Sequence, residues 1–102
     1  MGTRRTRAPR DHVVSGHWPH ARLDGDHAAA VAQAVSARLA RVLAEHGLSL
    51  NTVSKTAAVN RQTISNVLDG RVWPTIAVLA DLERALDTPI ALDPSLLSEE
   101  KA

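Results

Sequence analysis

Apolar and polar residues alternate with a helical period between residues 26 and 47. The larger apolar side chains recur at steps of three or four residues, and they are Val31, Val35, Leu39, Val42 and Leu43. This spacing places them on one side of an amphipathic helix, which we expect to face the core. Asp24 or Asp26 can accept hydrogen bonds from the first turn, and Gly47 can end the helix in a left-handed conformation.

Two short helices are predicted next along the chain. Ser49 can cap a helix over about residues 50–56, and Asn60 can cap another over residues 61–68. The link between them, residues 57–59, has the length of the turn in a helix-turn-helix, where two helices cross steeply.

A fourth helix follows the glycine that closes the third. Thr75 is the expected N-cap, and Thr88-Pro89 ends the helix. Its inner face is expected to carry Ile76, Leu79, Leu82, Ala85 and Leu86. A tail over residues 93–102 completes the chain, and Asp93-Pro94 could cap one more helical turn there.

Residues 1–26 show no helical period. They hold five arginines against three aspartates, and prolines and glycines interrupt them four times. We predict a flexible or irregular basic arm, in which residues 11–15 could become a strand if a partner edge were available. The expected fold is an all-α bundle of four to five helices, with a helix-turn-helix domain over residues 27–92.

Composition narrows the function classes. The chain has 102 residues, the size of one domain, and no cysteine, which excludes disulfides and thiolate metal sites. Its apolar runs are too short to cross a bilayer, and its start lacks the apolar stretch of a signal peptide, so we expect a cytoplasmic protein that does not contact membranes. A net charge of +1 does not by itself indicate a nucleic-acid binder.

Histidines in the first 27 residues raise the question of a metal site. His17 and His20 are three residues apart, but Pro19 argues against a regular helix that would hold them on one face. No carboxylate spacing completes a site, so we expect no metal and no other cofactor. The chain also lacks a nucleophile elbow, a phosphate-binding glycine loop and a paired-carboxylate motif, and we expect no enzymatic activity.

The helix over residues 61–68 has two different faces. On a helical wheel, Ile64, Val67 and Leu68 share the side that should anchor it to the core. The opposite side carries hydroxyl, carboxamide and guanidinium groups close to the helix start. These are the groups that read bases in the DNA major groove, where arginine pairs with guanine and Gln or Asn with adenine. The alternative is an ordinary polar face on a helix with a buried back.

From Leu48 to Ile90 the sequence resembles the Cro/repressor-type helix-turn-helix family, also called the XRE family. Residues 48–54 correspond to its capped second helix, and Val59-Asn60 fit the start of its recognition helix. The run Thr63-Ile64-Ser65-Asn66-Val67 matches the family's usual Thr-Ile-Ser-x-Ile. Gly70, Pro74 and the apolar ladder that follows match its glycine, proline and fourth helix.

Four positions depart from the family pattern. Leu68 stands where the end of the third helix commonly has glutamate, which removes an acid from the DNA-facing region. Ala58 stands where the turn usually has glycine, and Ser54 where the second helix usually has alanine. Leu50 replaces the glutamine that often contacts a phosphate, which moves that role to Ser49, Asn51 or backbone N–H groups.

The resemblance implies a lambda-repressor-like fold and a sequence-specific transcriptional regulator, a repressor, that inserts the helix over residues 61–68 into the major groove of double-stranded DNA. The residues expected to read bases are Arg61, Gln62, Thr63, Ser65 and Asn66. Those expected to bind phosphates are Ser49, Asn51, Lys55, Arg71 and Trp73. Lys55 could instead be an ordinary solvated lysine, and Trp73 a lid on the core.

The arm invites comparison with arms that enter the minor groove. Its arginines are Arg4, Arg5, Arg7 and Arg10. They could enter that groove or add only general electrostatic attraction. Such regulators usually bind palindromic operators as two-fold homodimers, and the first expectation for the dimer surface is the tail residues Leu92, Leu96 and Leu97, followed by the arm or the first helix.

Two alternatives remain. One is a module that binds a protein partner, such as the antitoxin of a toxin–antitoxin pair. The other is a helical structural domain without a role at DNA.

Overall fold

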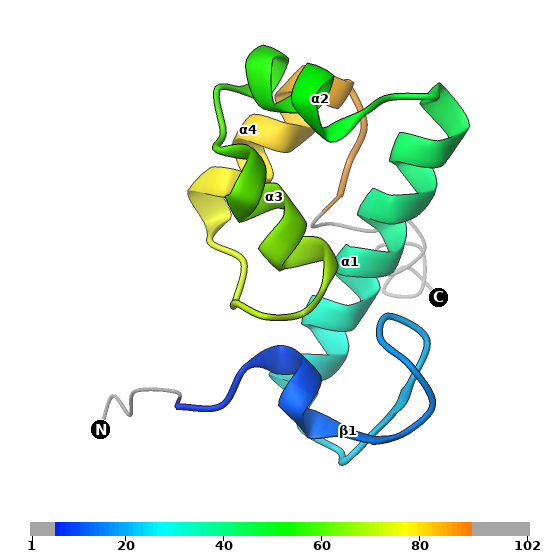
Figure 1. The fold of residues 1–102 in the computed structure, drawn as a ribbon. Coiled ribbons are helices and arrows are strands. Elements are labelled where there is room, and N and C mark those ends of the chain that lie inside the picture. The colour runs from blue at the N-terminus through cyan, green and yellow to red at the C-terminus, as the bar shows by residue number, and fades with distance from the viewer. Residues whose placement is uncertain (1–5, 91–102) are drawn as a thin grey trace, which may run out of the picture.

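Four helices form the body of the protein in a computed structural model, which describes residues 6–90. They are α1 (His27–His46), α2 (Leu50–Ala57), α3 (Arg61–Leu68) and α4 (Ile76–Leu86). Figure 1 shows α1 as a long helix along one side, with the three short helices packed together beside its C-terminal half. The expected all-α bundle is confirmed, and no described helix combines the length and the apolar character needed to span a bilayer.

The helix boundaries follow from local capping. The N-cap side chains accept hydrogen bonds from the first turn of all four helices, and they are Asp26, Ser49, Asn60 and Thr75. Gly47 ends α1 with a φ of 63°, in the left-handed region that glycine enters at low cost. Ser49, Asn60, Thr75 and Gly47 were expected in these roles from the sequence alone, and Asp26 was one of two candidates, with Asp24 as the other.

One hydrophobic core joins the four helices. Its most deeply buried side chains come from different elements and include Leu39, Val53, Ile64, Leu82 and Ile90. Because apolar burial contributes about 25 cal/mol for each Å² removed from water, this shared core is the main force that holds the short helices against α1. Arg38 reinforces the packing, since its Nε donates to the carbonyl of Pro89 at 2.8 Å.

Residues 7–24, here called the hairpin unit, are folded. A 3₁₀ helix, η1 (Pro9–His12), leads into an antiparallel pair of short strands, β1 (Val13–Ser15) and β2 (Arg22–Leu23). The expectation of a flexible or irregular arm is therefore corrected for this stretch, whereas the conditional strand at residues 11–15 finds its partner edge in β2. Arg4 and Arg5 lie outside the described residues.

The hairpin unit is held by contacts with distant parts of the chain. Ala21 both donates to and accepts from the Gln33 side chain of α1, at 2.8 and 3.1 Å. Pro9 and His12 are buried, and the backbone N–H of Arg10 donates to the Gly70 carbonyl at 2.9 Å. A period-based analysis detects none of these contacts, because they join residues far apart in sequence.

Two apolar residues expected on inner faces are exposed instead. Val31 of α1 is 44% exposed and Ile76 of α4 is 86% exposed. At 100° of rotation per residue, both lie about 100° around their helices from the centre of the buried stripe. A spacing of three or four residues predicts that both residues lie on the apolar side of their helices. It does not distinguish the edge of the buried stripe from its centre. The tail residues Leu92, Leu96 and Leu97 lie outside the described residues, as does the possible last turn at Asp93-Pro94.

Candidate nucleic-acid interface

Helix α3 presents two opposite faces. Ile64 and Val67 are 0% and 2% exposed and anchor the helix to the core. Gln62, Ser65 and Asn66 lie on the other side, with Arg61 and Thr63 at its margins; Arg61 and Gln62 are exposed, and Thr63, Ser65 and Asn66 are half-buried. All five side chains therefore remain accessible from solvent on one short helix.

Gln62 and Asn66 form a pair on the outer face of α3. The Gln62 side-chain amide donates to the Asn66 carbonyl oxygen at 3.0 Å, one turn further along. The pairing leaves the Asn66 NH₂ group as a donor and the Gln62 carbonyl oxygen as an acceptor, and adenine in the major groove offers their complements, N7 and N6–H. The two residues can therefore act as one preorganised recognition unit, a property that the sequence analysis did not anticipate.

The turn between α2 and α3 forms without the usual glycine. Ala58 adopts the left-handed conformation, with a φ of 57°, at a cost that glycine would largely avoid. The Ser54 hydroxyl donates to the Val59 carbonyl at 2.6 Å, across the turn. Ser54 thus supplies a hydrogen bond that alanine, the usual residue there, could not make.

A buried hydroxyl orients α3 relative to α1. Ser36 is 1% exposed, and its hydroxyl donates to the Val67 carbonyl near the end of α3 at 2.7 Å. This role of Ser36 was not predicted, although a single hydroxyl among the apolar positions of the α1 stripe is a signal that could have identified it. This bond fixes the far end of α3, while Ser54 fixes the turn that precedes it.

The residues expected to bind phosphates surround α3 but differ in availability. Asn51 and Lys55 are exposed on α2. The Ser49 hydroxyl is engaged in its cap, since it accepts from the Thr52 N–H at 3.2 Å and donates to the Thr52 hydroxyl at 3.0 Å. Arg71 is exposed just after α3 and lies 3.8 Å from the Asp69 carboxylate, an exposed pair that stabilises the protein little.

Trp73 packs against the hairpin unit, as expected of a lid on the core. Its ring meets the edge of the His12 ring at a centroid distance of 6.1 Å. The indole N–H, which was one candidate donor to a phosphate, donates to the Arg7 carbonyl at 2.9 Å. The hairpin unit therefore takes the hydrogen bond that the sequence analysis assigned to DNA.

An ionic cluster inside the hairpin unit stabilises it. His12 Nδ1 lies 2.9 Å from one Asp24 carboxylate oxygen and 3.1 Å from the other. The Arg7 guanidinium lies 3.7 Å from the same Asp24 carboxylate. The hydrogen bond with His12, and then that from the Asp26 backbone N–H, lower the pKa of Asp24 below its ordinary value. Arg7 also donates to the Asp11 carbonyl, so its guanidinium is held within the unit.

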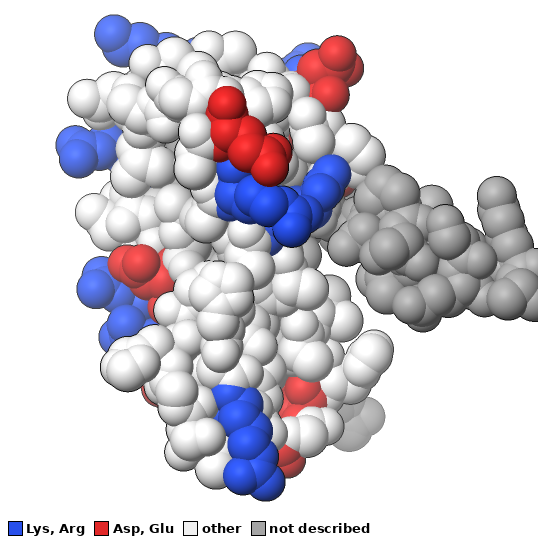
Figure 2. Space-filling view, turned by 90° about the vertical axis from the view of Figure 1, so that its right-hand side faces the viewer, with Lys and Arg blue, Asp and Glu red and all other residues white. Residues whose placement is uncertain are grey.

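Charged residues are sparse on the side of the molecule formed by α1. Figure 2 views this side and shows Lys and Arg as separate groups with uncharged surface between them, some beside an acidic side chain. Helix α1 itself carries exposed alanines, at positions 30, 34, 40 and 44. The described part of this side therefore offers no continuous basic surface to nucleic acid.

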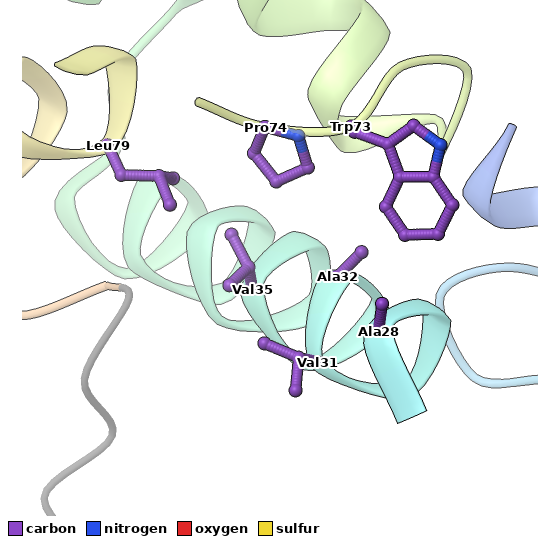
Figure 3. Close-up of a pocket in the computed structure, with 7 residues that line it drawn as sticks. All are labelled: Ala28, Val31, Ala32, Val35, Trp73, Pro74 and Leu79. Carbon is purple, nitrogen blue, oxygen red and sulfur yellow. The ribbon is translucent and has the colours of Figure 1, made fainter. Parts of the chain in front are cut away.

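An apolar groove of about 340 Å³ lies between α1 and the chain that leads into α4. Figure 3 shows Trp73 and Pro74 on one wall, facing Ala28, Ala32 and Val35 of α1. Exposed Val31 also lines the groove. In residues 6–90, no group of three or more His, Cys, Asp or Glu side chains is placed to hold a metal ion.

Comparison with known families also identifies a helix-turn-helix in this chain. A family model described as helix-turn-helix matches residues 38–92, more than half of the chain. No curated protein and no solved structure matches the chain.

Proposed function

We propose, from the membership of this chain in the Cro/repressor-type helix-turn-helix (XRE) family of DNA-binding regulators, that it is a repressor that recognises a specific operator in double-stranded DNA. In this proposal α3 enters the major groove. The protein acts in the cytoplasm as a homodimer on a palindromic operator, and it carries no catalytic activity.

The observation that carries the proposal is the outward Gln62–Asn66 pair on a helix with a buried back. Two carboxamides that already hydrogen-bond to each other lose less side-chain entropy when they meet a base pair. Arg61, exposed at the start of the same helix, adds the group that pairs with guanine O6 and N7. Thr63 and Ser65 complete the reading face.

Residues on α2 and after α3 are proposed to contact the DNA phosphates on either side of this reading face. Asn51 and Lys55 of α2 and Arg71 after α3 are exposed on either side of it in sequence and supply phosphate contacts. Because Ser49 is engaged in its cap, we assign its phosphate role to the backbone N–H groups that begin α2, where the helix dipole favours an anion.

The test begins with selection of bound duplexes from a random library, followed by sequencing of the bound pool. We expect one enriched, two-fold symmetric site with half-sites about 10 bp apart. Wild-type protein should bind that site at least about 1,000-fold more tightly than random duplex, which is the lower end for specific regulators. A pool without an enriched sequence would contradict the proposal.

Single variants then distinguish the residues that contact bases from those that contact phosphates. Arg61→Ala or Gln62→Ala should weaken binding to the selected site by about 1–3 kcal/mol and leave random duplex almost unaffected. Arg71→Ala should weaken both duplexes alike. The matched control is Arg41→Ala, which removes an exposed arginine from the outer face of α1 and should change neither affinity.

The hydrogen bond between Gln62 and Asn66 allows a more stringent test. If Gln62 and Asn66 act as one unit, their alanine variants must be non-additive, so that the double variant costs less than the sum of the two single variants. Additive losses would mean that the two amides read bases independently.

A second candidate function, a protein-interaction module of the antitoxin kind, is favoured by the apolar groove. Exposed Val31 lines this groove, and exposed Ile76 lies in sequence between the lining residues Pro74 and Leu79, so a protein partner could cover both. Isolation of the full chain in a stoichiometric complex with a second protein, weakened by Val31→Asp but not by Gln62→Ala, would support this function.

A further inference from the structure

The hairpin unit is fastened to the loop that follows α3. The Arg10 N–H donates to the Gly70 carbonyl, and the Trp73 indole donates to the Arg7 carbonyl, both at 2.9 Å. A Cβ built on Gly70 would lie only 2.5 Å from the Trp18 indole, so the two surfaces are in direct contact. Figure 1 shows η1, in dark blue, directly beside the loop that joins α3 to α4.

This attachment places Arg10 beside Arg71. Arg10 is exposed and its backbone bonds to Gly70, the residue that immediately precedes Arg71 in the chain. Arg10 and Arg71 are therefore attached to neighbouring backbone segments at the C-terminal end of α3, although 61 positions separate them in sequence.

The acidic residues of this region are already engaged, whereas Arg10 is not. The Asp11 carboxylate accepts from the Ala8 N–H, Asp24 bonds to His12, and Asp26 caps α1. The Arg10 guanidinium makes no hydrogen bond or ion pair with another described residue. Asp69, at the end of α3, lies 3.8 Å from Arg71, so among the described residues it is Arg10 that brings unpaired positive charge to this surface, complementary to a phosphate backbone.

We propose that the hairpin unit is a built part of the DNA-binding surface, and that Arg10 and Arg71 together hold the phosphates of one strand at the C-terminal end of α3. The inference rests on the proposed DNA-binding function and extends it. Arg10 is a fixed contact on a folded scaffold rather than one charge on a flexible arm. Because the scaffold is ordered before binding, this contact costs little conformational entropy.

The test measures the salt dependence of binding by fluorescence anisotropy, with the selected duplex and a random duplex, for full-length wild type and Arg10→Gln. Each phosphate contact contributes about 0.9 to the slope of log affinity against log salt concentration. We expect Arg10→Gln to lower the slope by about 0.9, which corresponds to roughly an eightfold loss of affinity at 0.1 M salt. Both duplexes should be affected alike, because phosphates carry no sequence information.

Arg22→Gln is the matched control within the same unit. Arg22 is also exposed, but it lies on β2 next to Ala21, which bonds to α1 rather than to the loop after α3. It should change the affinity less than twofold. The double variant Arg10→Gln/Arg71→Gln should lower the slope by about 1.8, the sum of two contacts.

The outcomes are distinguishable. If wild type binds its selected site tightly but Arg10→Gln behaves like Arg22→Gln, the hairpin unit does not contact DNA, and the inference fails while the proposed function stands. If wild type prefers no duplex, the proposed function fails and the inference fails with it. Equal thermal unfolding midpoints for wild type and Arg10→Gln verify that the substitution leaves the fold intact.

Discussion

The helix-turn-helix and the hairpin unit reach their structures by different routes. Helices α2 and α3 are specified locally, since Ser49 and Asn60 cap them and their apolar residues repeat with the helical period. The hairpin unit has short strands and no regular period, and it is ordered through Gly70, Trp73 and Gln33, all outside it. The comparison teaches that a segment can read as a flexible arm when its stability comes from distant residues.

The largest expected effect tests the contact between the two regions. Gly70→Ala should destabilise the protein by about 2–5 kcal/mol, because a left-handed alanine costs about 1–2 kcal/mol and a clash with Trp18 adds about 1–3 kcal/mol. Gly70 has a φ of 71° and its new Cβ would meet the Trp18 ring. Urea unfolding measures the change in the free energy of unfolding.

Gly47→Ala is the control for that clash. Gly47 has a φ of 63°, but nothing lies within 4 Å of its added Cβ, so only the backbone cost of about 1–2 kcal/mol applies. Equal losses for the two variants would show that the hairpin unit does not press against the loop at Gly70.

A smaller effect is expected inside the helix-turn-helix. Ser54→Ala removes the hydroxyl that bonds to the Val59 carbonyl and should cost about 1 kcal/mol in urea unfolding. Thr56→Ala removes an exposed hydroxyl from the same helix and should change stability by less than about 0.5 kcal/mol. If both variants cost the same, the bond across the turn contributes no specific stability.

Ala58→Gly should act in the opposite direction. It relieves the left-handed strain of Ala58 but gives the unfolded chain more freedom, for a net gain of about 0.5–1 kcal/mol. Ala40→Gly, on the exposed face of α1, should instead destabilise by about 1 kcal/mol, because its backbone is helical. Thermal unfolding of both variants tests the contrast in sign.

The smallest expected effect is the pH dependence of the hairpin unit. The pKa of Asp24 lies below its ordinary value of 3.8, so its stabilising contribution is present above that pH and is lost as the pH falls through the lowered pKa. Wild type should therefore unfold at higher urea than Asp24→Asn at pH 7, and this advantage should shrink as the solution is acidified below pH 3.8. An advantage that stays constant with pH would mean that the Asp24 charge does not stabilise the unit.

The sequence by itself determined the four helices, their caps and the two faces of α3. Capping bonds, such as the one that the Gln62 N–H donates to the Asn60 side chain, join residues two or three apart, and helical periods are equally local, so both can be predicted from the sequence. The same local pattern identified Arg61, Gln62 and Asn66 as the outward residues of α3.

Only the tertiary structure decided how the hairpin unit folds, where Trp73 directs its N–H, and that Val31 and Ile76 stay exposed. It also brought Arg10 next to Gly70 and joined Ser36 to Val67. Each of these outcomes depends on which distant surface lies opposite a residue. The periodicity of a chain sets the direction of a side chain, but the packing of the whole molecule sets what that side chain meets.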